Sequence, residues 1–230
     1  MRRGLRWAGV GAILVGIARV GQAQGPGLPV MNPGVPRGFT IATMAGFGND
    51  AAGGGTAFSL AGTAGFRRFA IGGFVSRLRG STLDDGSVAA GGGNLTIKVA
   101  GGPLVPVSIN FQAGLGYYAP GYSTSQTFKT WRAPVGLGIS WTIPRPVVAL
   151  KPWIAPRVDI RRITTPDPLA DPVPGGPIPT ITSTESEFGL SGGINFGLII
   201  GLGIDVAVDR VFAQGARPTT VGVGLSYTFK

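Results

Sequence analysis

The amino-acid sequence predicts an all-β protein, a transmembrane antiparallel up-and-down β-barrel of about ten strands that follows a cleaved signal peptide. Segments in which apolar residues alternate with small or polar residues recur along the chain, a period typical of strands with two different faces. Only 13% of the residues are charged, which is low for a protein whose outer surface meets water. The N-terminus has the layout of an export signal. Eight strands is the alternative count, if two weak, Gly-rich segments among the first few are not strands.

The first 23 residues have the three parts of a secretory signal peptide. Three arginines within the first six residues form a basic start, and an apolar stretch follows over residues 7–18. This stretch is too short for a spanning helix, which needs ~20 residues. Small residues precede Ala23, so we expect cleavage after it.

The rest of the chain is predicted to be one domain. Residues 24–36 are rich in Pro and Gly, and we expect an irregular lead-in on the periplasmic side, followed by the barrel over residues 37–230. The chain has no cysteine, so its stability must come from elsewhere than disulfides, and a closed barrel supplies it by pairing every strand on both sides. The cations that produce the formal net charge of +10 are scattered without a basic block, which argues against a nucleic-acid partner.

Five strands are predicted in the first half of the chain. They lie at about 37–48, 56–66, 69–78, 93–100 and 105–117. The fifth is the clearest, because its odd-numbered positions are apolar while its even-numbered positions from Ser108 to Gly116 are polar or glycine. A helix would place apolar residues three and four apart. The length of this segment suits a tilted membrane strand, which needs ~9–11 residues within the bilayer.

Five more strands are predicted in the second half. They lie at about 127–143, 148–160, 185–196, 202–210 and 218–230. Trp131 and Trp141 share one face of the first of these. At ~3.3 Å per residue and a tilt of ~40° they lie roughly 25 Å apart along the membrane normal, the height of the apolar band between two aromatic girdles. We therefore expect girdle positions for Trp131, Trp141, Tyr117, Tyr227 and Phe229. The alternative is a pair of core tryptophans in a soluble sandwich.

Three segments of the second half carry special expectations. Pro152 and Pro156 cannot donate hydrogen bonds to a ladder, so we expect bulges or distortion in strand 148–160. Residues 161–184 contain many prolines and are predicted to form the longest loop. Residues 188–208 are almost continuously apolar, but their many glycines favour a hairpin over a membrane helix.

The predicted connections alternate between short and long. Short turns lie near residues 67, 102, 145 and 199, and longer loops lie at 49–55, 79–92, 118–126, 161–184 and 211–217. Single-chain bacterial barrels have an even number of strands, short periplasmic turns and longer external loops. Ten strands with both termini in the periplasm satisfy this rule.

The last strand carries the resemblance to a known family. Residues 218–230 alternate strictly and place an aromatic, Phe229, next to the final Lys230. The chain thereby resembles small bacterial outer-membrane β-barrel proteins of the OmpA/OmpX-like or porin-like kind. The resemblance implies a location in the outer membrane of a Gram-negative-type bacterium. It also implies contact with the lipid of that membrane and insertion by the barrel-insertion machinery through the C-terminal strand.

Several charged side chains fall on the predicted inward faces. They are Lys98, Arg132, Lys151, Arg157, Asp159, Arg161, Glu187 and Asp205. We expect Arg132 opposite Asp159 and Glu187 near Arg161. These charges would form either a constriction that passes small anions or a paired network that plugs the barrel. Side chains largely fill the interior of an eight- to ten-stranded barrel, and this favours the plug.

The sequence predicts no enzyme, no cofactor and no metal ion. The chain contains no histidine, and it has neither a phosphate-binding loop nor the spacing of a zinc or calcium site. The predicted function is structural or that of a narrow porin-like channel for small solutes. One alternative is a surface adhesin that acts through its external loops, chiefly 161–184, on an unknown extracellular ligand. The other is a soluble exported β-sandwich.

Overall fold

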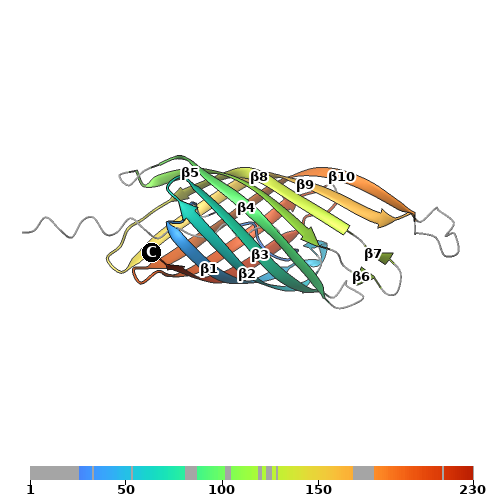
Figure 1. Ribbon diagram of the computed structural model, residues 1–230, viewed down its shortest axis with the longest axis horizontal. Helices are drawn as coiled ribbons and strands as arrows, with labels where there is room; N and C mark the ends of the chain where they lie inside the picture. The colour runs from blue at the N-terminus through green and yellow to red at the C-terminus, as the bar shows by residue number, and fades with distance from the viewer. Residues whose placement is uncertain are drawn as a thin grey trace, which may run out of the picture.

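Ten strands close into one antiparallel barrel, which confirms the predicted fold class and the count of ten rather than eight (Figure 1). The computed structural model describes residues 26–229 apart from 33, 53, 81–86, 102–104, 119–120, 123–125, 128, 168–178 and 214. The signal-peptide prediction and Lys230 lie outside the described residues. Within the described part of the chain, no helix has the length and apolar character needed to cross a membrane.

Each barrel strand pairs with the barrel strands before and after it in sequence, and β1 pairs with β12 to close the ring. The barrel strands are β1 (Gly38–Gly48), β2 (Gly55–Phe66), β3 (Phe69–Gly80), β4 (Val88–Ala100), β5 (Val107–Tyr118), β8 (Lys129–Trp141), β9 (Val148–Pro166), β10 (Thr180–Leu198), β11 (Leu202–Phe212) and β12 (Thr219–Phe229). A short 3-10 turn, η1 (Asp50–Ala52), follows β1, and the two-residue strands β6 (Gly121–Tyr122) and β7 (Gln126–Thr127) pair in the loop between β5 and β8.

The two faces of the barrel wall differ as the alternation predicts. In β12, Val221, Val223 and Leu225 are 45–53% exposed, whereas Ser226 and Thr228 are buried against the interior. The exterior is therefore apolar and much of the interior is polar, the reverse of a soluble barrel. An apolar exterior of this kind suits contact with lipid, and the architecture is that of a membrane-spanning β-barrel, the predicted fold class.

The two ends of the barrel are distinct. The short turns β2–β3, β8–β9 and β10–β11 lie at the left in Figure 1, together with the C-terminus, and the long loops lie at the right. Bacterial barrels keep their short turns in the periplasm. We call the end with the short turns the periplasmic end and the other the external end.

The hairpin of β9 and β10 is longer than predicted. Residues 161–166 and 180–184 belong to strands rather than to the predicted linker, and the ladder continues unbroken from Val148↔Leu198 to Pro166↔Thr180. Figure 1 shows this pair reaching beyond its neighbours at the external end. Residues 161–164 of β9 also pair with β8, whereas residues 180–187 of β10 pair with β9 alone. The hairpin is further held by a 3.1 Å contact between the hydroxyls of Thr164 and Thr182.

The prolines of β9 do not produce the expected bulge. The β8–β9 ladder stops at Gly136↔Arg157 and resumes in the same register at Ile139↔Ile154, so pairing is lost opposite Pro156 without a shift. Proline φ is compatible with an extended strand, and only the N–H donor is lost. The irregular register lies elsewhere, in β4 between Lys98 and Ala100.

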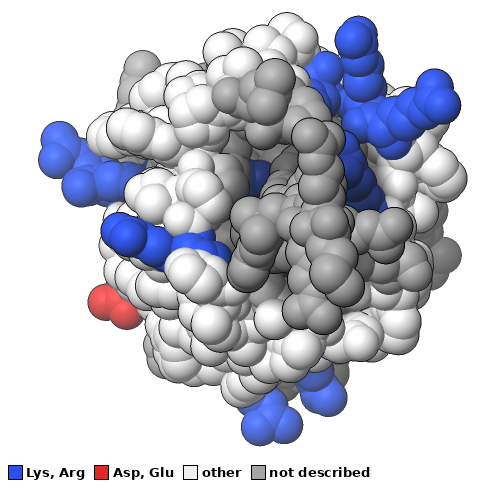
Figure 2. All heavy atoms as spheres, turned by 90° about the vertical axis from the view of Figure 1, so that its left-hand side faces the viewer, with Lys and Arg blue, Asp and Glu red and all other residues white. Residues whose placement is uncertain are grey.

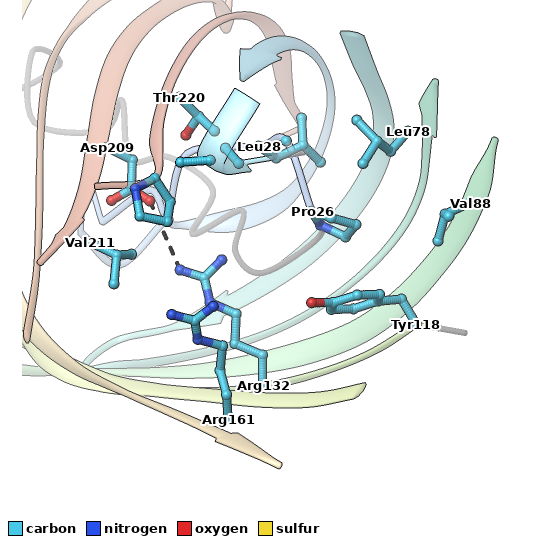
Figure 3. Close-up of a pocket in the computed structure, with 14 residues that line it drawn as sticks. Pro26, Leu28, Leu78, Val88, Tyr118, Arg132, Arg161, Asp209, Val211 and Thr220 are labelled. Atoms are coloured by element: carbon cyan, nitrogen blue, oxygen red, sulfur yellow. Dashed lines mark ion pairs between the residues drawn. The ribbon is translucent and has the colours of Figure 1, made fainter. Parts of the chain in front are cut away.

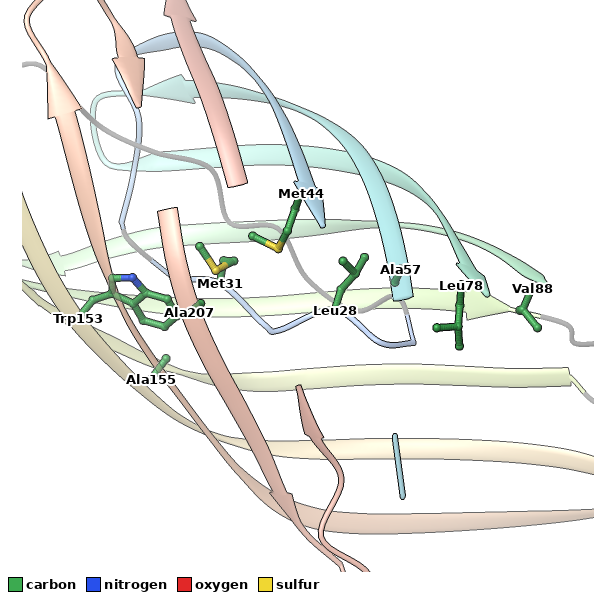
Figure 4. Close-up of a cluster of buried hydrophobic side chains, with 9 residues drawn as sticks. All are labelled: Leu28, Met31, Met44, Ala57, Leu78, Val88, Trp153, Ala155 and Ala207. Carbon is green, nitrogen blue, oxygen red and sulfur yellow. The ribbon is translucent and has the colours of Figure 1, made fainter. Parts of the chain in front are cut away.

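The predicted periplasmic lead-in lies inside the barrel. We call residues 26–32 and 34–36 the lumen segment. Its Leu28 and Met31 are buried, and they pack with Met44 and Leu78 from the barrel wall (Figure 4). The segment follows the barrel lengthwise, because Gly27 lies against Leu78 near the external end while Pro36 lies against Gly65 near the periplasmic end. Its apolar side chains are buried among the small side chains of the interior. They would stay exposed to water if the segment lay at the periplasmic mouth.

Candidate functional site

The centre of the site is Arg157 on β9, which binds two carboxylates inside the barrel. Its Nε and Nη2 lie 2.9 and 2.8 Å from Asp159 Oδ2, and its Nη1 and Nη2 lie 2.6 and 3.0 Å from the two carboxylate oxygens of Asp209 on β11. Arg157 and Asp159 are both buried. They are two residues apart on one strand, so the period of the strand places both on the inward face.

Arg132 on β8 joins this pair from the other side. Its Nε and Nη2 donate to the two oxygens of Asp159 at 2.9 and 3.0 Å, and its Nη2 lies 3.9 Å from Asp209. The predicted register was wrong by two residues, since Arg132 pairs across the ladder with Arg161, and Ile143 bridges to Leu150 rather than Val148. The arginine side chain is long enough to reach Asp159 diagonally.

Two small residues of β10 make room for these charges. The hydroxyl of Ser191 donates to Asp209 at 2.8 Å and accepts from Arg157 at 2.5 Å. Gly189 has no side chain, and a Cβ there would lie 2.7 Å from Cζ of Arg157 and 2.9 Å from Oδ2 of Asp159. The guanidinium of Arg157 therefore occupies the space that any other residue at position 189 would fill.

A second ion pair lies nearer the external end. Arg161 of β9 contacts Glu187 of β10, two residues along the ladder from its direct partner Glu185. Together with the central cluster this gives three arginines and three carboxylates. We call Arg132, Arg157, Arg161, Asp159, Glu187 and Asp209 the lumen network. Its formal charges balance, as burial away from water requires.

Three predicted lumen charges lie apart from this network, toward the periplasmic end. Asp205 on β11 is buried, accepts from the amide of Asn195 and lies 3.5 Å from the hydroxyl of Ser226. Lys151 on β9 approaches the lumen segment at Gly34. Lys98 is half-buried near the end of β4. All three face inward, but they do not meet the arginine–carboxylate cluster.

Asp209, which accepts hydrogen bonds from Arg157 and Ser191, was not among the predicted lumen charges. The signal was present, because Asp205 and Asp209 are four residues apart on one strand and alternation puts them on the same face. The lumen segment was also missed, since a Pro- and Gly-rich stretch has the same composition whether it lies in water or inside a barrel.

A cavity of about 250 Å³ opens above the lumen network at the external end. We call it the vestibule. Leu28 of the lumen segment, Leu78, Val88 and Tyr118 line its apolar part, and Arg132, Arg161 and Asp209 line its polar part. Figure 3 shows the two guanidinium groups close together and directed toward Asp209, with Leu78 and Val88 on the other side. Among the described residues, no group of three or more His, Cys, Asp or Glu side chains could hold a metal ion.

The predicted girdle aromatics point outward near the two ends of the wall. Trp131 and Tyr117 lie toward the external end with ring centroids 4.7 Å apart. Trp141, Tyr227 and Phe229 lie toward the periplasmic end, where the last two rings are 4.8 Å apart. Their contact with the membrane interface stays a prediction.

No protein-family model and no curated protein matches the sequence. Among solved structures, the chain is similar to Ail, the attachment invasion locus protein of Yersinia pestis, with 12% identity and a TM-score of 0.41 over 84% of this chain and 99% of that one. It is similar to the KdgM porin in complex with disordered oligogalacturonate, with 13% identity and a TM-score of 0.41 over 83% and 99%. It is also similar to the outer membrane protease OmpT from Escherichia coli, with 11% identity and a TM-score of 0.40 over 84% and 94%. The names of these three proteins describe different roles. Similarities this distant do not assign any of those roles to this chain.

Proposed function

We propose that this protein is a closed, non-enzymatic outer-membrane barrel whose role is structural rather than that of a channel. The observation that carries the proposal is the filling of the interior by the chain's own residues. The lumen segment runs along the barrel with Leu28, Met31 and Asn32 buried, and the lumen network lies on the inner wall over the adjacent strands β8 to β11.

The charge balance of the lumen network supports the same function. A constriction that attracts small anions needs cations that are not already neutralised. Here Arg132 and Arg157 bind Asp159 and Asp209 through short, charge-assisted hydrogen bonds. Removing any one partner would leave a buried charge without compensation, so the cluster serves to hold strands together better than to pass ions.

The non-enzymatic role rests on the chemistry of the lumen side chains. The hydroxyl of Ser191 accepts from Arg157 and donates to Asp209, and both oxygens of that carboxylate already accept hydrogen bonds from Arg157. This pairing holds the serine in the network and does not resemble the pairing of a nucleophile with a dedicated base. The chain also supplies no histidine for general acid–base catalysis.

Planar bilayer recording tests the proposal. The refolded chain that begins at residue 24 is expected to give no steady conductance in any of several salts. A chain that begins at Arg37 lacks the lumen segment, and it is expected to open discrete conductance steps because the space beside the lumen network is no longer filled. Steady conductance of the longer chain would overturn the proposal.

A second candidate function is binding at the cell surface by the β9–β10 hairpin. Its outer part is exposed at Thr182, Thr184 and Glu185 and extends beyond its neighbours (Figure 1). Replacing residues 164–182 by a two-residue Asn-Gly turn is expected to abolish adhesion of cells that display the protein, with an unchanged amount of folded barrel in the membrane. Undiminished adhesion of the shortened variant would remove this candidate.

A further inference from the structure

The periplasmic end of the barrel carries cations, and no acidic side chain is exposed there among the residues that the structure describes. Arg67 and Arg68 form the β2–β3 turn, Arg145 lies in the β8–β9 turn, and all three are exposed. Of the acidic residues that the structure describes, Asp205 comes nearest to this end, and it is buried. Figure 2 looks at this end and shows Lys and Arg side chains around the rim, with acidic atoms only at the margin of the view.

Part of this charge forms a continuous ridge over neighbouring strands. Arg37 directly precedes β1, and Arg67 and Arg68 join β2 to β3; all three are exposed. We call Arg37, Arg67 and Arg68 the basic ridge. Three cations at the ends of adjacent strands create a local field that attracts phosphate.

The backbone of Arg67 indicates that the cation itself matters at this position. Its backbone φ is 38°, which lies in the left-handed region that residues other than Gly and Asn rarely adopt. Two-residue hairpin turns favour Asn-Gly for this reason. An arginine at such a position is unfavourable for the turn, and a strained residue of this kind points to a role outside folding.

Apolar groups beside the basic ridge place it at the level of lipid headgroups. Phe66 and Phe69 flank the turn with ring centroids 5.4 Å apart, and both rings face outward. Other turns at this end expose aliphatic side chains, with Val147 60% and Ile200 66% exposed. Aromatic and aliphatic groups next to arginines suit a membrane interface, where rings sit at headgroup depth and cations meet lipid phosphates.

From this placement we infer that the basic ridge binds the headgroups of acidic phospholipids, such as phosphatidylglycerol, in the leaflet around the periplasmic end. The phosphodiester would accept hydrogen bonds from the arginines, while Phe66 and Phe69 pack against the upper part of the acyl chains. A soluble acidic protein is a poorer occupant, because it would leave the exposed aliphatic turns in water. This inference does not depend on whether the lumen conducts.

Native mass spectrometry from mixed micelles with equal amounts of phosphatidylglycerol and phosphatidylcholine tests the inference. The full chain is expected to retain phosphatidylglycerol in preference. In the variant Arg37→Gln/Arg67→Asn/Arg68→Gln, that preference is expected to fall about fivefold for each cation removed. Asn suits the left-handed position, and heat-modifiable migration on a gel checks that the barrel has folded.

The matched control removes three exposed cations at the external end instead. Arg79→Gln/Lys129→Gln/Arg162→Gln is expected to keep the lipid preference of the full chain. Equal retention of both lipids by the full chain would overturn the inference, as would an equal loss in both variants. Binding of polyglutamate without any preference for phosphatidylglycerol would overturn it in favour of an acidic protein partner.

Discussion

At the scale of single residues, a glycine decides where the charged side chains of the lumen can meet. The guanidinium of Arg157 reaches both Asp159 and Asp209 only because Gly189 leaves space beside it. The neighbouring groups are fixed by short hydrogen bonds on several sides, so they cannot move aside cheaply when a side chain is added.

Gly189→Ala is therefore expected to lower the free energy of unfolding by about 1–3 kcal/mol, because its Cβ would meet Arg157 Cζ at 2.7 Å. Gly192→Ala on the same strand is the control, since its Cβ would have its nearest neighbour, the carbonyl oxygen of Trp153, at 3.5 Å. Urea unfolding in lipid vesicles, followed by tryptophan fluorescence, measures both. Equal effects of the two substitutions would show that Gly189 is not the residue that makes room for the network.

The partners of the inward charges were only partly predictable at this scale. Alternation placed Arg132 and Asp159 on the interior faces of their strands, but the register between those strands was expected two residues away from the observed one. Asp209 was overlooked although the same alternation places it inside. The two-residue period of a strand determines which face a residue lies on. Its partners across the ladder depend also on the register between neighbouring strands, which a single sequence does not determine.

At the scale of elements, the strands that cross the membrane were predictable because one face of each meets lipid. The predicted strands 37–48, 56–66 and 202–210 differ from β1, β2 and β11 by two residues or fewer at either end. The outer ends of β9 and β10 were missed, since the hydrophobic alternation ends before the pairing does. Both faces of β10 are exposed over residues 180–186, and the outer residues of β9 are mostly half-buried on either face. Prolines then suggested a loop where residues 161–166 continue the strand.

The strained β2–β3 turn gives a prediction at the same scale. Arg67→Asn is expected to raise the free energy of unfolding by about 1 kcal/mol, because Asn tolerates the left-handed conformation better than Arg does. Arg68→Asn, the neighbouring substitution, is the control and is expected to change stability little, since Arg68 has no positive φ. Urea midpoints of the two variants and the unsubstituted chain measure the difference. A loss of stability in Arg67→Asn would contradict this prediction, because it would show that the arginine side chain stabilises the turn and does not strain it.

At the scale of the whole molecule, the barrel and the lumen segment stabilise the fold in different ways. The ring of ten strands closes through β1 and β12 and leaves no edge unpaired, which gives most of the stability of a membrane barrel. The lumen segment adds buried apolar side chains such as Leu28 and Met31. Its polar contacts are fewer, because the side-chain oxygen of Asn32 and the amide of Asn110 on the facing wall have no hydrogen-bond partner among the described residues.

This division predicts that the barrel folds without the lumen segment. A chain that begins at Arg37 is expected to show the heat-modifiable migration of a folded barrel, and its free energy of unfolding should be roughly 2–4 kcal/mol lower than that of the chain from residue 24. The loss stays small because the burial of a few apolar side chains is partly offset by the conformational entropy that the segment regains on release. Urea unfolding of both chains in the same vesicles measures the difference. If the shorter chain failed to fold, the segment would be a core on which the wall assembles, and strand pairing alone would not account for closure of the ring.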